Sequence, residues 1–281
     1  EVEVEVEVCN NWHCPHSESM TMLSNRNCPI CDNSLSKRLD VYSPEEWDLV
    51  ACVECNFAYL QNPPDYEALK EELSWEKLYE QKKSKGGSTP LSQLARWLRT
   101  LTHRKGGSRI ERHAVDWFGA GNVLDVGCGT IVRTQPPITP FGIEISKAMH
   151  AKVDKEMKER GGYCVLASGA NGVWDFEPEF FDGAILHSYL EHEADPNRVL
   201  SGLHHCLKQG AKVFVRVPNY GSFNRRIVGR KWCGFRHPDH VNYFDVESLR
   251  TISKKNGFTL EVLNKLSLAI DDNINALLIK N

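Results

Sequence analysis

Residues 123–130 have the sequence Val-Leu-Asp-Val-Gly-Cys-Gly-Thr, in which a short, mostly apolar segment leads directly into a glycine-containing turn. Such a segment is typical of a buried strand of a parallel sheet. Glycine at positions 127 and 129 allows the backbone to turn sharply and to approach a ligand closely, because a Cβ would obstruct both. We therefore predict a strand that ends at a ligand-binding turn.

Two common phosphate-binding motifs do not fit this turn. A dinucleotide-binding turn needs a third glycine at position 132, where the chain has Val132. The segment also lacks the Gly-Lys-Ser/Thr ending of a P-loop. Glu144 ends the next predicted strand, and an acid there can accept hydrogen bonds from both hydroxyls of a ribose. The turn and the acid together indicate an adenosine ligand without a pyrophosphate.

Strands and helices alternate along the chain after Gly121. Ser146, Asp195 and Asp245 each precede a helical segment and can cap it, and the helix after Asp195 is expected to run to Gly210. This alternation predicts an α/β fold with a Rossmann-like, doubly wound, mostly parallel seven-stranded sheet and a ligand at the carboxyl ends of the strands. The predicted strands are 123–126, 141–145, 163–167, 182–187, 211–217, about 258–267 and 273–280.

Several spaced elements in residues 115–281 resemble those of class I S-adenosylmethionine (SAM)-dependent methyltransferases, in particular the type 11 and type 23 groups. Asp125-Val-Gly-Cys-Gly129 is similar to the glycine motif of that family, and Glu144 to its ribose acid. Residues 181–187 resemble its fourth strand, and Glu191-His192 resembles the start of the motif that follows. The resemblance implies SAM as the cofactor, bound by Asp125, Gly127, Cys128, Gly129, Glu144, Ile145 and His187.

The chain departs from the family pattern just after the turn. Ile131 replaces the usual third glycine, and 14 residues separate the last glycine of the turn from the ribose acid. The helix that normally follows must be short or irregular, because Pro136-Pro137 interrupts it. Fewer helix N–H groups can then face the methionine carboxylate of SAM, and Arg133 or Gln135 is the expected replacement.

Four of the ten cysteines form two Cys-x2-Cys pairs, Cys28/Cys31 and Cys52/Cys55, with 20 residues between the pairs. Tetrathiolate zinc sites have this spacing. The segment from Cys28 to Pro64 has too few large apolar residues for a core of its own, so we predict a structural Zn²⁺ whose coordination sphere the four thiolates fill. The arrangement resembles the zinc ribbon that precedes many bacterial methyltransferases, often of glycan or secondary-metabolite pathways.

The predicted organisation has four parts. Residues 1–25, which begin with alternating Glu and Val, are expected to be a disordered leader. Residues 26–64 form the zinc ribbon, residues 65–115 a helical connector, and residues 116–281 the methyltransferase domain. Apolar residues within 91–101 recur at helical spacing, so one connector helix is expected to be amphipathic.

Two histidines are the candidate catalytic residues. Methyl transfer requires alignment of nucleophile, methyl group and sulfur, with a base where the nucleophile carries a proton. His187 ends the fourth strand and is expected to point at the methyl donor. His192 is a candidate base, although it can equally hold a backbone turn. Quinone O-methyltransferases add to a similar Glu-His pair an acid that can hold a metal; Ser188 stands in its place, so a catalytic metal is not predicted.

The loop after the fifth strand, residues 224–240, is basic and aromatic, with five Lys and Arg residues against one Asp. Because strand ends face the ligand, we expect the acceptor site here, and its charge favours an anionic substrate such as a phosphate or carboxylate. An ordinary solvated charged surface is the alternative interpretation. The expected substrate-binding residues are Arg225, Arg226, Arg236, His237 and His240.

The favoured function is methyl transfer from SAM to a small or medium, anionic metabolite. An rRNA or tRNA methyltransferase is the first alternative, since rRNA guanine methyltransferases also join a zinc module to this fold; the net charge of −3 disfavours it. A non-catalytic interaction module with the same fold is the second. The chain lacks a signal-peptide pattern and an apolar run of the roughly 18 to 20 residues that span a bilayer, so we expect a cytoplasmic protein without a membrane partner. The oligomeric state is not predicted.

Overall fold

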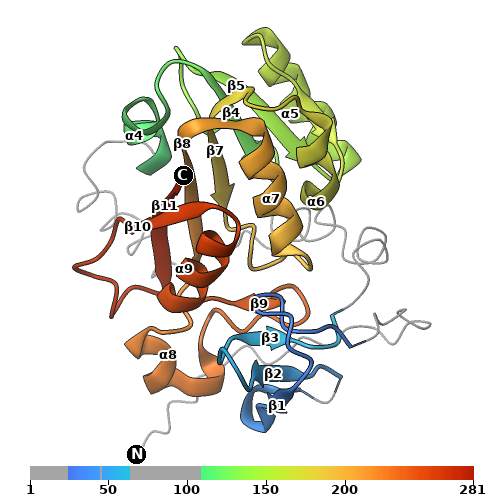
Figure 1. Ribbon diagram of the computed structural model, residues 1–281. Coiled ribbons are helices and arrows are strands. Elements are labelled where there is room, and N and C mark those ends of the chain that lie inside the picture. Colours follow the sequence, from blue (N-terminus) through green and yellow to red (C-terminus); the bar gives the residue numbers. More distant parts are fainter. Residues whose placement is uncertain (1–24, 45, 64–108) are drawn as a thin grey trace, which may run out of the picture.

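The protein is described by a computed structural model, which covers residues 25–44, 46–63 and 109–281 (Figure 1). The predicted leader, apart from residue 25, and most of the predicted connector lie outside these described residues. The amphipathic segment 91–101 lies outside them as well. None of the described helices is long and apolar enough to cross a membrane.

A seven-stranded sheet forms the centre of the molecule, with the strand order β10-β11-β8-β7-β4-β5-β6. Neighbouring strands pair in parallel except at β11, which is antiparallel to both β8 and β10. The predicted α/β, Rossmann-like and mostly parallel sheet is therefore confirmed. Its strands are β4 (Asn122–Val126), β5 (Thr139–Glu144), β6 (Cys164–Leu166), β7 (Phe181–His187), β8 (Leu207–Pro218), β10 (Phe258–Val262) and β11 (Asn273–Lys280).

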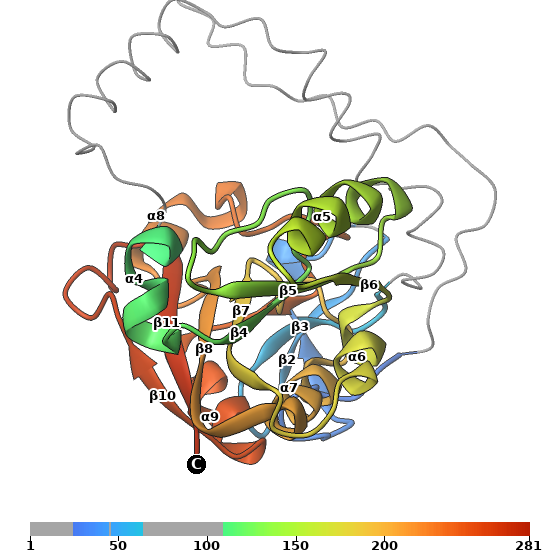
Figure 2. The same cartoon turned by 90° about the horizontal axis from the view of Figure 1, so that it is seen from above.

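Helices cover both faces of this sheet (Figure 2). Alternate residues of β4 point to opposite faces, so Val123 packs with α4 whereas Leu124 belongs to the cluster that includes α7 and α9. Residues of α5 pack on the same face as Gly142, whose missing Cβ leaves room for Met157. The helices are α4 (Arg109–Phe118), α5 (Lys147–Glu159), α6 (Gly169–Gly172), α7 (Pro196–Cys206), α8 (Phe223–Val228) and α9 (Val246–Lys255), with 3₁₀ turns η1 (Asp40–Tyr42), η2 (Val173–Asp175) and η3 (Gly229–Lys231).

The predicted helix starts are confirmed by side-chain caps. Ser146, Asp195 and Asp245 each accept a hydrogen bond from a backbone N–H in the first turn of α5, α7 and α9. In α9 the cap is reciprocal, because the Ser248 hydroxyl also accepts a hydrogen bond from the Asp245 N–H at 3.0 Å. These polar side chains satisfy N–H groups that a helix leaves without an internal partner.

The predicted end of α7 is wrong. The helix stops at Cys206 rather than at Gly210, because Leu207 is fully buried and already pairs with Phe181 of β7. Gly210 lies inside β8 with a φ of 74°, close to the place where the β7–β8 pairing becomes irregular. A glycine there permits a local irregularity of the strand that other residues resist. It therefore marks a bulge rather than the end of a helix.

The segment between β4 and β5 is a loop. Residues 127–138 are all described, and none of them is helical. This confirms that the helix usual at this point of the family pattern is not regular here. The glycine turn is consequently held by side chains instead of by a helix N-terminus.

The cysteine-containing segment forms a small antiparallel sheet with a strand from the other part of the molecule. Its order is β1-β2-β3-β9, and β9 (Asn242–Tyr243) follows β8 in the chain. Figure 1 shows this sheet below the large one, beyond the carboxyl end of β7. Cys28, Phe57 and Tyr59 also belong to the same buried cluster as the large sheet, so the two parts share a core. The remaining strands are β1 (Ser36–Arg38), β2 (Leu49–Cys52) and β3 (Ala58–Leu60).

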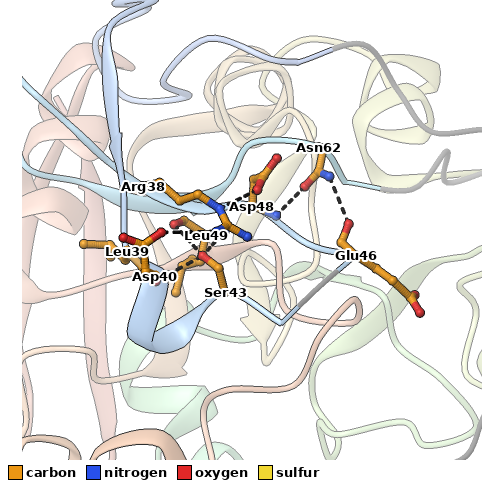
Figure 3. A network of polar contacts seen from close by, with 8 residues as sticks. All are labelled: Arg38, Leu39, Asp40, Ser43, Glu46, Asp48, Leu49 and Asn62. Atoms are coloured by element: carbon orange, nitrogen blue, oxygen red, sulfur yellow. Dashed lines mark hydrogen bonds and ion pairs between the residues drawn. The ribbon is translucent and has the colours of Figure 1, made fainter.

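Polar contacts fix the connection between β1 and β2 (Figure 3). Arg38 Nε donates to Asp48 Oδ1 at 2.7 Å, and the Ser43 hydroxyl donates to the Leu39 carbonyl at 3.0 Å. The Asp48 N–H donates to Asn62 Oδ1 at 2.7 Å. This hairpin therefore depends on local hydrogen bonds as well as on the shared core.

Candidate functional site

The glycine turn after β4 adopts a conformation that glycine favours. Gly127 and Gly129 have φ values of 68° and 65°, in the left-handed region. A Cβ at position 127 would lie 2.6 Å from the ring of Tyr189, whereas one at position 129 would meet no atom within 4 Å. Gly127 is thus required by packing, and Gly129 borders open space that a ligand can enter.

Glu144 holds this turn in place. Its buried carboxylate accepts the Gly129 N–H at Oε2 and the Ser146 N–H at Oε1, both at 2.8 Å. A carboxylate oxygen has two lone pairs, so both oxygens can accept a further hydrogen bond. Ile145, half-buried, follows directly after β5. The structure therefore places the predicted ribose acid beside the glycine turn.

Asp125 and Arg133 close the other side of the turn. Arg133 Nη1 lies 2.6 Å from Asp125 Oδ2 and also donates to the Cys128 carbonyl at 3.0 Å. Burial raises the pKa of Asp125, and the guanidinium of Arg133 opposes this effect. The Cys128 side chain is fully buried, with its Sγ 3.7 Å from that of Cys164. Arg133 thus belongs to the non-helical segment that follows the turn and binds back to it.

A group of basic residues lies at the carboxyl ends of β7 and β8. His187 ends β7 and pairs with Arg216 of β8 in the sheet register. Burial lowers the pKa of His187 to about 4, with further contributions from the positive charges of Arg133 and Arg216. Arg216 donates to the Ser188 hydroxyl at 2.9 Å, and Ser188 itself has a φ of 55°. Strained backbone of this kind is frequent at functional sites.

Sequence reasoning missed Arg216. Its signal was the arginine inside Val-Phe-Val-Arg-Val, residues 213–217, a strand that is otherwise apolar. A charged residue near the carboxyl end of a central strand points to a ligand, because such strands are buried on both faces. The pairing of Arg216 with His187 required the strand order, which the residues alone do not give.

The Glu191–His192 pair meets the loop that follows β8. His192 Nδ1 lies 2.8 Å from the Asp239 carbonyl and 3.0 Å from Asp239 Oδ1. His240 Nδ1 lies 2.9 Å from the Gly234 carbonyl, and the His192 and His240 rings are 4.8 Å apart, edge to face. Burial raises the pKa of Glu191 to about 7. The structure thus brings together two of the predicted site residues, His192 and His240, from distant parts of the chain.

The other predicted acceptor residues have different surroundings. The Arg225 guanidinium stacks on the Tyr220 ring at 4.0 Å, and Arg226 is exposed on α8. Arg236 is also exposed and pairs with Asp239 at 2.8 Å. His237 Nδ1 lies 3.2 Å from a tyrosine hydroxyl within an aromatic cluster, where burial lowers its pKa. The loop therefore directs aromatic rings inward and much of its positive charge toward solvent.

The four paired cysteines converge. Their Sγ atoms all lie within 4.8 Å of one another, and the Cys28–Cys55 and Cys31–Cys52 separations are 3.5 Å. A tetrahedral Zn²⁺ with Zn–S bonds of about 2.3 Å would hold sulfurs about 3.8 Å apart. Burial raises the pKa of the Cys28 thiol to about 11, so a cation is needed to keep such a thiolate ionised. The donor set fits zinc.

The two cysteine turns have the same geometry. The Asp32 N–H donates to the Cys28 carbonyl at 2.8 Å, and the Asn56 N–H donates to the Cys52 carbonyl at 3.0 Å. Asp32 and Asn56, each directly after the second cysteine of its pair, have φ values of 63° and 57°. Asp and Asn tolerate this left-handed conformation better than most residues. The sequence therefore forms two matching turns that face one another.

Arg26 connects the cysteine segment to the segment after β7 and to the end of the loop that follows β8. Its guanidinium donates to the carbonyls of Ala194 and Val241 at 2.8 and 2.6 Å and to Asn242 Oδ1 at 3.0 Å. Lys255 of α9 donates to the Ile30 carbonyl at 3.0 Å. Ala194 follows the Glu191–His192 pair, and Val241 follows His240. One side chain of the cysteine segment thus binds both of the segments that contribute His192 and His240.

A protein-family model described as "Methyltransferase domain" matches residues 90–263. The chain belongs to this methyltransferase family. A curated relative, the uncharacterized protein MJ1123 of Methanocaldococcus jannaschii, is 25% identical over 138 residues, which are 49% of this chain and 64% of that protein. The chain therefore spans just under two thirds of the length of this relative.

Solved structures of methyltransferases are also similar to the chain. A SAM-dependent methyltransferase from Archaeoglobus fulgidus is 18% identical to this chain, with a TM-score of 0.48. The match covers 73% of this chain and 100% of that chain. Phosphoethanolamine N-methyltransferase 2 of Haemonchus contortus, solved with SAM, is 17% identical to this chain, with a TM-score of 0.46. The match covers 83% of this chain and 64% of that chain.

Proposed function

We propose that this methyltransferase transfers the methyl group of SAM to a small or medium, anionic metabolite. The observation that carries the proposal is the division of one sheet edge into two chemically different sides. At β4 and β5 a glycine turn lies beside a buried acid, and at β7 and β8 His187 pairs with Arg216 in the sheet register and is subject to the positive charges of Arg216 and Arg133. The first side suits a nucleoside with a ribose, and the second suits an anion.

The donor side fits SAM in three respects. Open space borders Gly129, where a side chain would otherwise obstruct a ligand. Glu144 can accept hydrogen bonds from the ribose hydroxyls while it holds the turn. Asp125 Oδ1 is buried and has no hydrogen-bond partner in the described part of the chain, so it can receive an ammonium group. Bound SAM would supply a methyl group already activated by its sulfonium.

The charges of the second side favour an anionic acceptor. Arg133 is neutralised by Asp125, but Arg216 donates to a neutral hydroxyl and keeps its positive charge. His187 is uncharged at neutral pH because its pKa is about 4. A neutral imidazole accepts a hydrogen bond from an acceptor O–H or N–H and can orient it. A nearby anion would raise the pKa of His187 and make it a better proton acceptor.

Calorimetry tests the proposal directly. We expect SAM and its demethylated product to bind the purified chain, and phosphate- or carboxylate-bearing metabolites to accept the labelled methyl group. If neither SAM nor its demethylated product binds at millimolar concentration, the assignment as an enzyme is wrong and a non-catalytic interaction module is favoured. The salt dependence of acceptor binding separates metabolite from RNA, because RNA binding through many phosphates weakens steeply with salt. A steep dependence would overturn the metabolite proposal.

A further inference from the structure

We propose that Glu191, His192 and His240 bind a divalent transition-metal ion on the acceptor side of the site. This would be a second metal site, distinct from the four cysteines. One carboxylate and two imidazoles provide the ligand atoms, which lie within 4.8 Å of one another. His192 Nε2 and Glu191 Oε1 are 4.0 Å apart. A four-coordinate ion holds such atoms about 3.4 Å apart, so small side-chain movements would close the group around it.

The outer contacts of both histidines are those of metal ligands. Each places Nδ1 at hydrogen-bond distance from a backbone carbonyl, that of Asp239 for His192 and that of Gly234 for His240. The Asp239 carboxylate adds a second contact to His192 at 3.0 Å. Hydrogen bonds at Nδ1 fix the tautomer in which Nε2 carries the lone pair, and metal-bound histidines are normally oriented in this way. The arrangement therefore prepares both rings to ligate through Nε2.

Glu191 supplies the independent observation. Glu191 is only 2% exposed to solvent, and its Oε2 has no hydrogen-bond partner among the described residues. A buried carboxylate without a partner is costly, and a bound cation is one of the few ways to stabilise it. The ion-pair contact with His192 does not explain this oxygen, because that contact involves Oε1. A metal ion held among the three residues accounts for it.

The donor set indicates which ions are suitable. Two imidazoles and one carboxylate suit Zn²⁺, Mn²⁺, Fe²⁺ or Co²⁺, whereas Mg²⁺ and Ca²⁺ prefer oxygen ligands throughout. Three protein ligands also leave at least one coordination position open. We infer that an oxygen of the anionic acceptor occupies this position, a role that rests on the proposed function. His192 would then act as a ligand, and the ion would polarise the acceptor.

The sequence alone did not suggest this site. Ser188 stands where an acid would complete a local metal motif, so the Glu191–His192 pair lacked a further ligand. The structure supplies His240 from the loop after β8. Arg26 holds both segments through their backbone carbonyls, so the cysteine segment stabilises the position of the third ligand. The two metal sites are thus expected to be mechanically linked.

Cobalt substitution tests the proposal, because the cysteine site acts as an internal standard. We expect the wild-type chain to bind Co²⁺ at two sites. The cysteine site should show intense thiolate charge-transfer absorption, and the second site should show the weaker bands of nitrogen and oxygen ligands. Glu191→Gln and His240→Asn should each lose the second ion and retain the thiolate band, which also reports that the ribbon is folded. His237→Asn is the matched control, since His237 lies in the same loop outside the group, and it should keep both ions.

Any of three results would contradict the proposed site. The wild-type chain could bind metal at the cysteines alone, or His240→Asn could retain the second ion as fully as His237→Asn does. Loss of the second ion in all three variants would equally refute the ligand assignment. SAM binding, measured separately by calorimetry, shows whether the proposed function has failed instead. A chain that binds the second ion without SAM would keep the metal site and reject the methyltransferase role.

Discussion

The proposed donor side and the proposed acceptor side share one sheet edge but differ in how the chain builds them. Donor-side contacts are local in sequence: Glu144 binds Gly129 at a separation of 15 positions, and Arg133 binds Asp125 at a separation of 8. Acceptor-side contacts span longer separations, since Arg216 binds Ser188 across 28 positions and His192 contacts Asp239 across 47. Arg26, which holds the neighbouring backbone, reaches Val241 across 215 positions. The donor side can therefore form with its own loop, whereas the acceptor side exists only in the complete fold.

The largest effect is expected from a change in the four-cysteine site, which supports the acceptor side. Cys52→Ser should abolish binding of the Zn²⁺ predicted at the four cysteines and lower the Tm of the whole chain by about 10 °C or more, because the cysteine segment shares the main core. Metal analysis and calorimetry of unfolding would measure both. Cys233→Ser is the control, since Cys233 is exposed and lies outside the cluster. A metal-free wild-type chain, or a variant with unchanged Tm, would contradict the prediction.

The next effect compares two glycines within the donor side. Gly127→Ala should cost about 2 to 5 kcal/mol of stability, because left-handed strain adds to overpacking against the Tyr189 ring. Gly129→Ala meets no atom within 4 Å, so strain alone should cost about 1 to 2 kcal/mol. Denaturant unfolding would measure these costs.

SAM affinity should fall more in Gly129→Ala than in Gly127→Ala, which is the reverse of the order expected for stability. The Cβ that Gly129→Ala introduces would enter the space proposed for the ligand. Its main effect should therefore be weaker binding of SAM, with only a small loss of folding stability. Equal losses of stability in the two variants would show that Tyr189 moves aside. Unchanged SAM affinity in Gly129→Ala would place the ligand elsewhere.

Glu144 tests the electrostatics of the donor side. Glu144→Ala should weaken binding of the demethylated cofactor about 10- to 100-fold, since charge-assisted hydrogen bonds contribute about 1.5 to 3 kcal/mol each. Part of this loss would come from Gly129, whose N–H loses its acceptor. Calorimetry provides the measurement, and Glu159→Ala on the exposed end of α5 is the matched control. Equal affinity in both variants would mean that another residue binds the ribose.

The same contrast explains what could be predicted from the sequence. Strand β4, the glycine turn, Glu144 and the helix caps depend on periodicity and on neighbours a few positions away, which the residues display directly. The end of α7 could not be predicted, because Leu207 leaves the helix to pair with Phe181. That pairing depends on the position of β7 in the sheet. Local patterns carry little information about such tertiary preferences.

The basic loop shows the limit of counting charges. Its cations predicted an acceptor site, but a count of residues does not show which way each side chain points. Packing decided this, since Trp232 is 2% exposed while Arg226 faces solvent. The residue that the structure brings to the site from this loop is His240, which is buried. Arg216, outside the loop, is the cation that the sequence analysis did not identify.

The smallest expected effect compares Arg216 with Arg226. Arg216→Gln removes a positive charge that acts on His187 and should raise the pKa of His187 above its value of about 4, as measured by NMR titration. Because that pKa lies below the unfolded value of 6.5, His187 costs the fold stability as pH falls from 6.5 toward 4. This loss should be smaller in Arg216→Gln, and anionic acceptors should bind a few-fold more weakly. Arg226→Gln, on exposed α8, should change neither property. Identical titration of His187 in both variants would show that Arg216 does not contribute to the pKa of His187 and would remove Arg216 from the acceptor side.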